Sequence, residues 1–250
     1  MRQANQSNPN LKLAFDYQVW AWQKMDMQSR KPSASSKNAR GTRDNGAATR
    51  KLLLEAAGII FAQKGFDRAT AKEIADAAGT NAASVNYHFG GIERLYEAVL
   101  VHAHDELISL RQLQDMTADD LPAQEKLRRL MAMVVALFTG PDTSSWAIRV
   151  ISREFLSPSP YLVVLREKAL DPKKSLILDI VAELADLPKD DPAVMRCFFN
   201  IAAPCGMLLM VNREMFRQVL PSLEKSDPAT LERHLVQFAL GGISAVVASR

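Results

Sequence analysis

Residues 70–89, TAKEIADAAGTNAASVNYHF, decide the fold, because they predict two short helices joined by a tight turn. Thr70 is a favourable N-cap residue, and Glu73 three residues later completes a capping-box pattern. Gly79 can adopt the left-handed backbone that ends a helix at a sharp bend. The first half of the stretch therefore predicts a helix of about two turns with a defined start and end.

The second half of the stretch predicts a helix that is anchored at only two positions. Asn81 caps its start, and Val85 and Phe89, four residues apart, form one apolar stripe. The other positions carry small or hydrogen-bonding side chains: Ala82, Ala83, Ser84, Asn86, Tyr87 and His88. A short helix with this composition suits insertion into a DNA major groove. Together the two halves predict a helix-turn-helix motif.

The residues before the motif predict a third helix, which ends at Gly65. Leu53, Ala57 and Ile60 share one helical face, and Phe61 lies beside them. From here the chain resembles the TetR family of bacterial transcription regulators over roughly residues 48–110. The matching residues are Leu53, Ala57, Phe61, Gly65, Phe66, Thr70, Ile74, Ala75, Ala78, Gly79, Val85 to Phe89, Leu95 and Tyr96. The NYHFGG wording is closest to a subgroup that carries its own C-terminal ligand domain.

The rest of the chain predicts helices and no strand pattern longer than a few residues. The predicted helices cover residues 93–110, 123–138, 145–156, 161–185, 193–216 and 228–249. The fold class is therefore all-α. The resemblance implies an N-terminal three-helix DNA-binding domain followed by a larger helical domain for ligand binding and dimerisation. We expect an N-terminal extension over 1–45, the DNA-binding domain over 46–92 and the C-terminal domain over 93–250.

Composition fits a soluble cytoplasmic protein. The 250 residues are 48% apolar, and the formal net charge is +3. No run reaches the roughly 18–20 apolar residues of a membrane span, and no export signal opens the chain. Cys197 and Cys205 suggest no disulfide framework, and we expect both thiols to be reduced.

Positive charge is concentrated between Arg30 and Lys51. This segment contains seven basic residues and the single acid Asp44, so its net charge is +6. This segment is rich in Ser, Ala, Asn and Gly and lacks apolar periodicity, which predicts a flexible basic arm. Beside a helix-turn-helix, such an arm would neutralise DNA phosphates, with Arg43 and Arg50 as its DNA-binding candidates. The alternative is a solubilising tail.

The first 26 residues admit two interpretations. An apolar cluster over 11–22 could be an extra segment that packs on a partner, or the start codon could be assigned too early. Met25 and Met27 directly precede the basic arm. A start there would give the short polar leader usual in the resembled family, and we favour it.

The last two predicted helices carry two apolar stripes each, whereas a surface helix needs one. We expect a four-helix seam between two copies of the chain, which is how the resembled family dimerises. The predicted interface residues are Phe198, Ile201, Cys205, Leu208, Leu235, Phe238 and Gly242. The alternative is a pair of core helices within one subunit. A twofold dimer would place two reading helices about one DNA turn (~34 Å) or a multiple apart, so the operator should be nearly palindromic.

The resemblance also implies roles for individual residues. Thr70 and Lys72 would lie against phosphate, Tyr87 and His88 would contact the DNA backbone, and Ser84 could bond either phosphate or base. The remaining candidates, which would approach base edges or cap the reading helix, are Asn81, Ala82, Ala83 and Asn86. One position departs from the family, since Ile92 stands where a phosphate-binding lysine is common. For Tyr87 and His88 the alternative is ordinary packing.

The C-terminal domain is expected to bind a small apolar effector with a polar or anionic end. Its candidate ligand-binding residues are Met131, Phe138, Trp146, Arg149, Arg153, Phe155 and Met207. Pro204 lies mid-helix and should kink it beside a pocket. The predicted function is a homodimeric, effector-released regulator of transcription, which we expect to repress; the residues leave activation or dual action open.

The sequence also bears on two other classes of protein, an enzyme and a constitutive DNA-binding protein. An enzyme would need a catalytic constellation, and no phosphate loop, Cys-x-x-Cys or nucleophile elbow is present. His102 and His104 point to different helix faces, which disfavours a shared metal, so no metal or cofactor is expected. The second class is a constitutive DNA-binding or architectural protein without an effector, which would show no cavity in its C-terminal domain.

Overall fold

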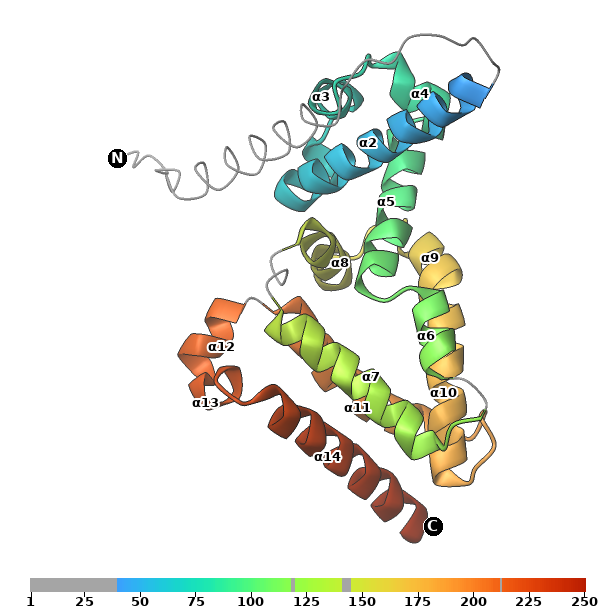
Figure 1. Ribbon diagram of the computed structural model, residues 1–250, viewed down its shortest axis with the longest axis vertical. Helices are drawn as coiled ribbons and strands as arrows, with labels where there is room; N and C mark the ends of the chain where they lie inside the picture. Colours follow the sequence, from blue (N-terminus) through green and yellow to red (C-terminus); the bar gives the residue numbers. More distant parts are fainter. Residues whose placement is uncertain (1–39, 118–119, 141–144, 212) are drawn as a thin grey trace. The chain divides into compact units, whose positions relative to one another are not determined.

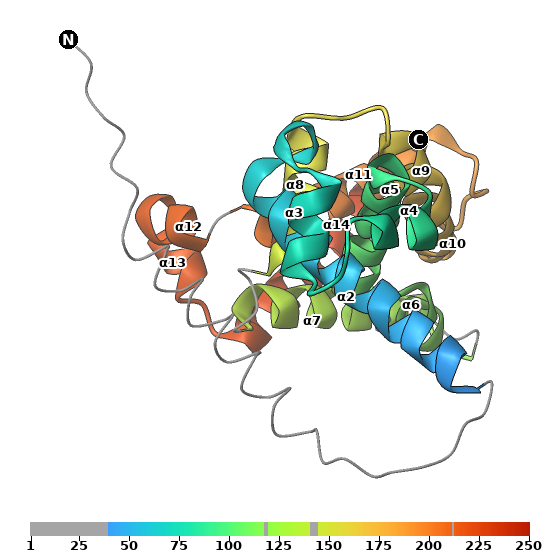
Figure 2. The same ribbon diagram turned by 90° about the horizontal axis from the view of Figure 1, so that it is seen from above.

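The computed structural model describes residues 40–117, 120–140, 145–211 and 213–250, with side chains from Gly46 onward. Within these ranges the regular structure is helical and contains no strand (Figures 1 and 2). Residues Gly46–Arg250 form one compact unit, which holds the helices discussed below. The basic arm before residue 40, the side chain of Arg43 and the apolar cluster over 11–22 lie outside the described residues.

Five elements make up the first part of this unit. They are α2 (Arg40–Lys64), a 3₁₀ turn (Phe66–Arg68), α3 (Ala71–Ala77), α4 (Ala83–Phe89) and α5 (Ile92–Leu107). As predicted, α2 ends at Gly65, whose φ of 78° lies in the region that favours glycine. The three helices expected from the sequence are therefore present and are followed by α5.

The remaining helices begin with α6, which the sequence analysis missed. The predicted helix over 93–110 is two helices, because Ile108 is extended and Ser109 starts a new one. Ser109 and Gln112 form a full capping box, a signal that was readable in the sequence. The predicted helix over 193–216 is also divided, because Val211 is extended. The helices are α6 (Leu110–Met116), α7 (Ala123–Thr139), α8 (Trp146–Leu156), α9 (Leu162–Leu165), α10 (Asp171–Ala185), α11 (Pro192–Met210), α12 (Arg213–Val219), α13 (Pro221–Glu224) and α14 (Pro228–Ala248).

A π-helical turn over Arg166–Leu170 joins α9 to α10. Pro172 lacks an N–H and cannot make the usual bond four residues back, while the Asp171 N–H bonds to the Arg166 carbonyl five residues back. The wider turn shifts the register of α10 relative to α9. The sequence predicted one long helix over 161–185 and did not predict this change.

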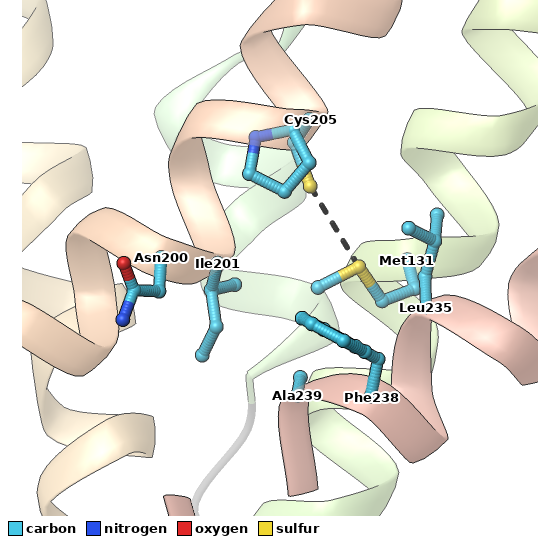
Figure 3. A pocket seen from close by; sticks show the side chains of 8 residues that line it. Met131, Asn200, Ile201, Cys205, Leu235, Phe238 and Ala239 are labelled. Carbon is cyan, nitrogen blue, oxygen red and sulfur yellow. Dashed lines mark hydrogen bonds between the residues drawn. The ribbon is translucent and has the colours of Figure 1, made fainter. Parts of the chain in front are cut away.

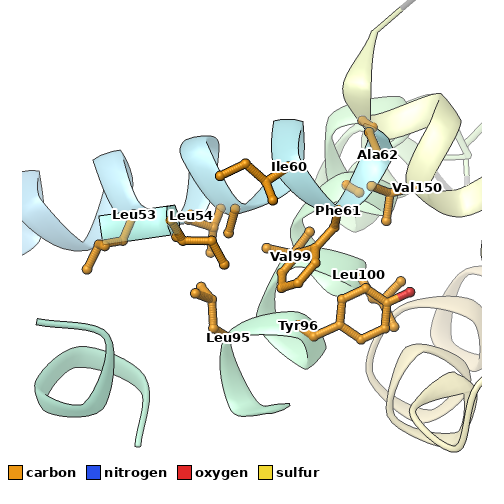
Figure 4. Packing of buried hydrophobic residues seen from close by; sticks show 14 of the residues in the cluster. Leu53, Leu54, Ile60, Phe61, Ala62, Leu95, Tyr96, Val99, Leu100 and Val150 are labelled. Atoms are coloured by element: carbon orange, nitrogen blue, oxygen red, sulfur yellow. The ribbon is translucent and has the colours of Figure 1, made fainter. Parts of the chain in front are cut away.

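The first hydrophobic core is built from both sides of the predicted domain boundary. Leu53 and Phe61 of α2 and Leu95 of α5 are buried in one cluster with Val150 of α8 (Figure 4). Leu165 of α9 belongs to the same cluster. Helix α5 therefore packs against the α2–α4 helices and against α8 and α9. One hydrophobic core therefore spans the predicted boundary at residues 92 and 93.

Two further clusters lie among α6, α7, α10, α11, α12 and α14. One contains Leu127, Val181 and Ile243, and the other contains Phe138 and Phe216 in edge-to-face contact at 5.3 Å. Helix α7 packs on α14, and α10 packs on α11. These contacts define the C-terminal helical body.

Gly58 allows α2 to approach α8 closely. A Cβ atom at Gly58 would lie 2.4 Å from the Trp146 ring. We expect Gly58→Ala to lower the free energy of unfolding by about 1–3 kcal/mol, because a packed ring has to move. Gly46→Ala on the same helix is the matched control, since its Cβ meets nothing within 4 Å. Urea denaturation of both variants checks this prediction, and equal effects at the two glycines would contradict it.

Candidate nucleic-acid interface

The start of α3 follows the predicted cap. The Thr70 hydroxyl oxygen accepts a hydrogen bond from the Glu73 backbone N–H at 3.2 Å. The reciprocal half of the capping box is not formed; the Glu73 carboxylate pairs with Lys64 at the end of α2. The second residue of the predicted box therefore ties α3 to α2 and does not cap its own helix.

The turn into α4 also follows the sequence prediction. Gly79 has a φ of 66°, and the Asn81 side-chain oxygen accepts a hydrogen bond from the Ser84 backbone N–H at 3.1 Å. Val85 is fully buried, while Phe89 is half-buried beneath the Arg50 guanidinium, 4.6 Å above the ring centroid. Two apolar anchors hold α4 onto α2 and α5, as predicted.

The hydrogen-bonding side of α4 faces solvent. Tyr87 is 85% exposed, which rules out ordinary packing as its role, and its ring contacts His88 edge-on at 4.9 Å. The predicted DNA-contact residues that are exposed are Arg50, Thr70, Lys72, Asn81, Ala82, Ala83, Asn86 and Tyr87; Ser84 and His88 are half-buried. The structure thus brings this set to one helix-turn-helix surface, and their contacts with DNA remain predictions.

Helix α5 is tied to α2 and α8 by a polar cluster. The Glu55 carboxylate lies 3.4 Å from His102 Nε2 and accepts a hydrogen bond from Trp146 Nε1 at 3.2 Å. The hydrogen bond with Glu55 raises the pKa of His102, and the same bond lowers the pKa of Glu55. Trp146, predicted to bind ligand, instead donates a hydrogen bond within the chain at this junction.

Helix α5 is tied to α10 by a buried lysine. Lys173 Nζ lies 2.8 Å from His104 Nδ1 and 2.5 Å from Asp105 Oδ1. An ammonium group has only donors, so His104 Nδ1 must accept and the ring is neutral. Burial, followed by the Lys173 charge, lowers the pKa of His104 to about 4.

This arrangement predicts a pH dependence. The unfolded His104 binds a proton near pH 6.5 and the folded one only near 4. The contribution of His104 to the free energy of unfolding is therefore fully present at neutral pH and is lost as the pH drops below about 6.5, because the unfolded state takes up the proton first. We expect a loss on the order of 2 kcal/mol between pH 7 and 5.

His104→Asn isolates this effect, because asparagine keeps an acceptor towards Lys173 and does not titrate. Urea unfolding of the wild type and the variant at pH 7 and pH 5 is the measurement. The variant should lose less stability on acidification than the wild type. An identical pH slope in the two proteins would contradict the assignment.

The predicted ligand-binding residues do not come together. Met131 and Phe138 are buried in different core clusters, and Trp146 packs at the α2–α5–α8 junction. The rest are exposed, namely Arg149, Arg153, Phe155 and Met207. The structure does not bring these seven side chains to one place, because helical periodicity alone does not show which faces converge; their role in ligand binding stays a prediction. Among the described residues, no His, Cys, Asp or Glu cluster could hold a metal.

One small pocket lies between α7, α11 and α14 (Figure 3). Its lining residues are Met131, Asn200, Ile201, Pro204, Cys205, Leu235, Phe238 and Ala239. The predicted mid-helix Pro204 does border it. Its interior space of about 20 Å³ suffices for about one water molecule. Burial raises the pKa of the Cys205 thiol to about 11, so this thiol is unreactive at neutral pH.

The structure divides the predicted dimer interface. Ile201 and Leu208 are buried in core clusters of the same chain, whereas Phe198, Cys205 and Leu235 are half-buried and pack against those clusters. Ile201 and Leu208 therefore lie in the interior of the subunit, and a role of the predicted set in joining two copies stays a prediction. Only Phe238 and Gly242 of the predicted set are exposed.

Exposed apolar side chains also occur on α11 and α14. Phe199 is 67% exposed on α11, and Phe238 is 71% exposed on α14. We call the following set the apolar face: Met195, Phe199, Ala203 and Met207 of α11 with Phe238, Gly241, Gly242 and Ala245 of α14. Met195 and Phe199, which are four residues apart, belong to the second of the two apolar stripes in the predicted helix over 193–216.

Helix α11 is long and apolar enough to cross a membrane by length and composition, and only 28% of its most apolar stretch is buried. From the sequence, no apolar run long enough to span a membrane was expected. Its buried side packs against α7, α10 and α14. The exposed apolar side chains of α11 belong to the apolar face.

An anchored α4 with an exposed hydrogen-bonding side defines a helix-turn-helix transcription regulator. A family model described as bacterial regulatory proteins, tetR family, matches residues 53–99, and the C-terminal domain model of the HTH-type transcriptional dual regulator CecR matches residues 123–243. The chain belongs to the TetR family and has a CecR-like C-terminal domain. The family consists of transcription regulators and not enzymes.

Individual relatives agree with this assignment. The chain is 27% identical to the HTH-type transcriptional activator FasR of Mycolicibacterium smegmatis over 214 residues, covering 85% of this chain and 91% of that protein. It is 30% identical to CecR of Shigella flexneri over 146 residues, covering 55% and 65%. FadR from Bacillus subtilis, solved in complex with stearoyl-CoA, shares the fold with a TM-score of 0.58 at 14% identity, covering 77% and 98%.

Proposed function

We propose that this chain is an effector-responsive repressor that binds a nearly palindromic operator as a homodimer and is released by a small molecule. The observation that supports this proposal most strongly is the burial pattern of α4, in which Val85 is fully buried while Asn86 and Tyr87 face solvent. An 85% exposed tyrosine on a helix this short makes few contacts within its own chain. Its ring and hydroxyl are available to a DNA backbone.

The apolar face supports the homodimer. Two large aromatic side chains and a row of small residues on α11 and α14 remain outside the core. Gly241 and Gly242 have open space where a Cβ would be, which suits the close approach of a second helix. If two copies pair through this face about a twofold axis, each contact between them occurs twice. The same axis relates two α4 helices, one for each half-site of the operator.

Release by an effector follows from linkage. A ligand that binds the released arrangement more tightly lowers operator affinity, and a coupling of roughly 1–3 kcal/mol changes it by about 5- to 150-fold. Relatives carry the names activator, dual regulator and repressor, so the sign of regulation is part of this proposal. As a regulator of operator DNA, the protein would act in the cytoplasm.

The test begins with selection of bound sequences from a random duplex library by the purified full chain. The recovered site should be an inverted repeat, and fluorescence anisotropy should give a salt-dependent affinity with two chains per site. Titration with stearoyl-CoA, the ligand named for the Bacillus subtilis structure, and with fractionated cell extract then probes release. Failure to enrich any duplex would refute the proposal.

A second candidate is constitutive DNA binding without an effector. The pocket between α7, α11 and α14 favours it, because effector sites commonly enclose about 300–1,000 Å³ and this space is about 20 Å³. An effector that binds in this pocket would have to part these helices. Operator affinity that stays constant in every extract fraction would support the constitutive protein, while a fraction that releases DNA would exclude it.

A further inference from the structure

Glu154 is a buried carboxylate held by neutral donors. It lies in α8 and is 1% exposed, and among the described residues no cation forms an ion pair with it. A buried charge is costly unless its hydrogen bonds are made. The residues that make those bonds therefore determine whether this part of the fold is stable.

Both carboxylate oxygens of Glu154 are occupied. Tyr96 Oη donates to Oε2 at 2.9 Å, and the Ser159 backbone N–H and hydroxyl each donate to Oε1 at 2.9 Å. Burial, followed by the nearby Glu154 charge, raises the pKa of Tyr96, so its hydroxyl keeps its proton and remains a donor. The network joins α5, α8 and the corner between α8 and α9.

The corner that presents Ser159 is stiff. Pro158 and Pro160 flank it and restrict the backbone on both sides. The Ser159 hydroxyl also accepts a hydrogen bond from the Tyr161 backbone N–H at 3.2 Å. The two donors of Ser159 consequently move with the corner and not independently of it.

Tyr96 connects this network to the DNA-reading helices. Its ring contacts Phe61 of α2 edge-on at 4.8 Å, Phe66 at 5.0 Å and Tyr161 at 5.5 Å (Figure 4 shows it beside Phe61). Helix α4 packs directly on α5. A change in the orientation of α5 relative to α8 therefore moves α4.

We propose that the Glu154 carboxylate, bonded to Tyr96 and Ser159, is a latch that fixes α5 to the α8–α9 corner in the operator-binding arrangement. Partial opening would leave a buried charge with too few donors, so the latch has a closed and an open state and few stable positions between them. An effector that moves the corner would open it. This inference rests on the proposed function and names the positioning residues that regulate it.

The test compares two Tyr→Phe variants in the same aromatic cluster. Tyr96→Phe removes the donor to Glu154, whereas Tyr161→Phe removes a hydroxyl that does not bond to Glu154. Operator affinity should fall about tenfold for Y96F and stay within about twofold of wild type for Y161F. Wild-type affinity for Y96F, or an equal loss for Y161F, would overturn the latch.

A double-mutant cycle separates positioning from general destabilisation. If Tyr96 acts through Glu154, then Y96F should weaken operator binding little further when added to Glu154→Gln. Additive losses in the double variant would overturn the proposal.

A measurement on the wild type covers the case in which these variants do not fold. The Ser159 amide hydrogen should exchange more slowly in the operator complex than in the unbound protein, and unchanged exchange would overturn the latch. If the wild type selects no duplex, the proposed function fails and the latch fails with it, whereas a duplex that wild type and Y96F bind equally overturns the latch alone, so the two failures are distinguishable.

Discussion

Replacing Phe199 and Phe238 together by aspartate is expected to give a monomer with operator affinity reduced by roughly 100-fold to 10,000-fold, because a monomer loses the avidity of two linked half-sites. Both rings are more than two-thirds exposed and contribute little to the core of the single chain. In a twofold interface each substitution occurs twice, so four carboxylates would face an apolar seam. Burying such charges without partners is strongly unfavourable.

The matched control for this prediction is Val219→Asp. Val219 is 64% exposed and apolar but lies on α12, outside the apolar face. This variant should remain a dimer with unchanged operator affinity. Light scattering after size-exclusion chromatography gives the mass, and fluorescence anisotropy gives the affinity. A double aspartate variant that remains dimeric would show that another surface joins the two copies.

Substitutions in α4 should separate base reading from backbone contact. Asn86→Ala is expected to cost roughly 1–3 kcal/mol at the selected operator and less at unrelated duplexes, because a bidentate amide discriminates between bases. Tyr87→Ala should weaken binding about tenfold on every sequence, since backbone contacts position the protein without reading sequence. Neither change should alter stability greatly, because both side chains are exposed.

Anisotropy titrations with the selected operator and a scrambled duplex measure both effects. Gln114→Ala on α6 is the control, because Gln114 is exposed and lies outside the helix-turn-helix. If Asn86→Ala lowers affinity equally on both duplexes, Asn86 is a backbone contact. If all three variants bind like the wild type, α4 does not read DNA in this protein.

Local signals explain why the reading helices could be predicted. Thr70, Gly79 and Asn81 act through the backbone of their own turn, so their roles depend on few distant residues. Val85 and Phe89 follow the helical repeat, which shows directly which side of α4 is apolar. Caps, glycine conformation and periodicity are properties that a sequence displays directly.

Long-range contacts explain the errors. Ile201 and Phe199 lie on adjacent stripes of one apolar helix, and only the packing of α7, α10 and α14 decides which stripe enters the core. Likewise, the pairing of His104 with Lys173 joins α5 to α10, and the π turn before Lys173 is marked in the sequence only by Pro172. For the same reason the sequence did not show that the predicted ligand-binding residues lie apart in the structure.

The core shared between α5 and α8 limits how this protein can be re-engineered. Leu95 and Val99 of α5 are fully buried, and Val150 and Ile151 of α8 belong to the same cluster. A chimaera that transplants residues 46–92 onto a foreign sensor would leave these side chains behind, so Leu53 and Phe61 of α2 would lose the neighbours that bury them and expose apolar surface to water. An exchange of operator specificity between such proteins therefore requires either grafting α4 alone or transferring α5 and α8 together with the helix-turn-helix.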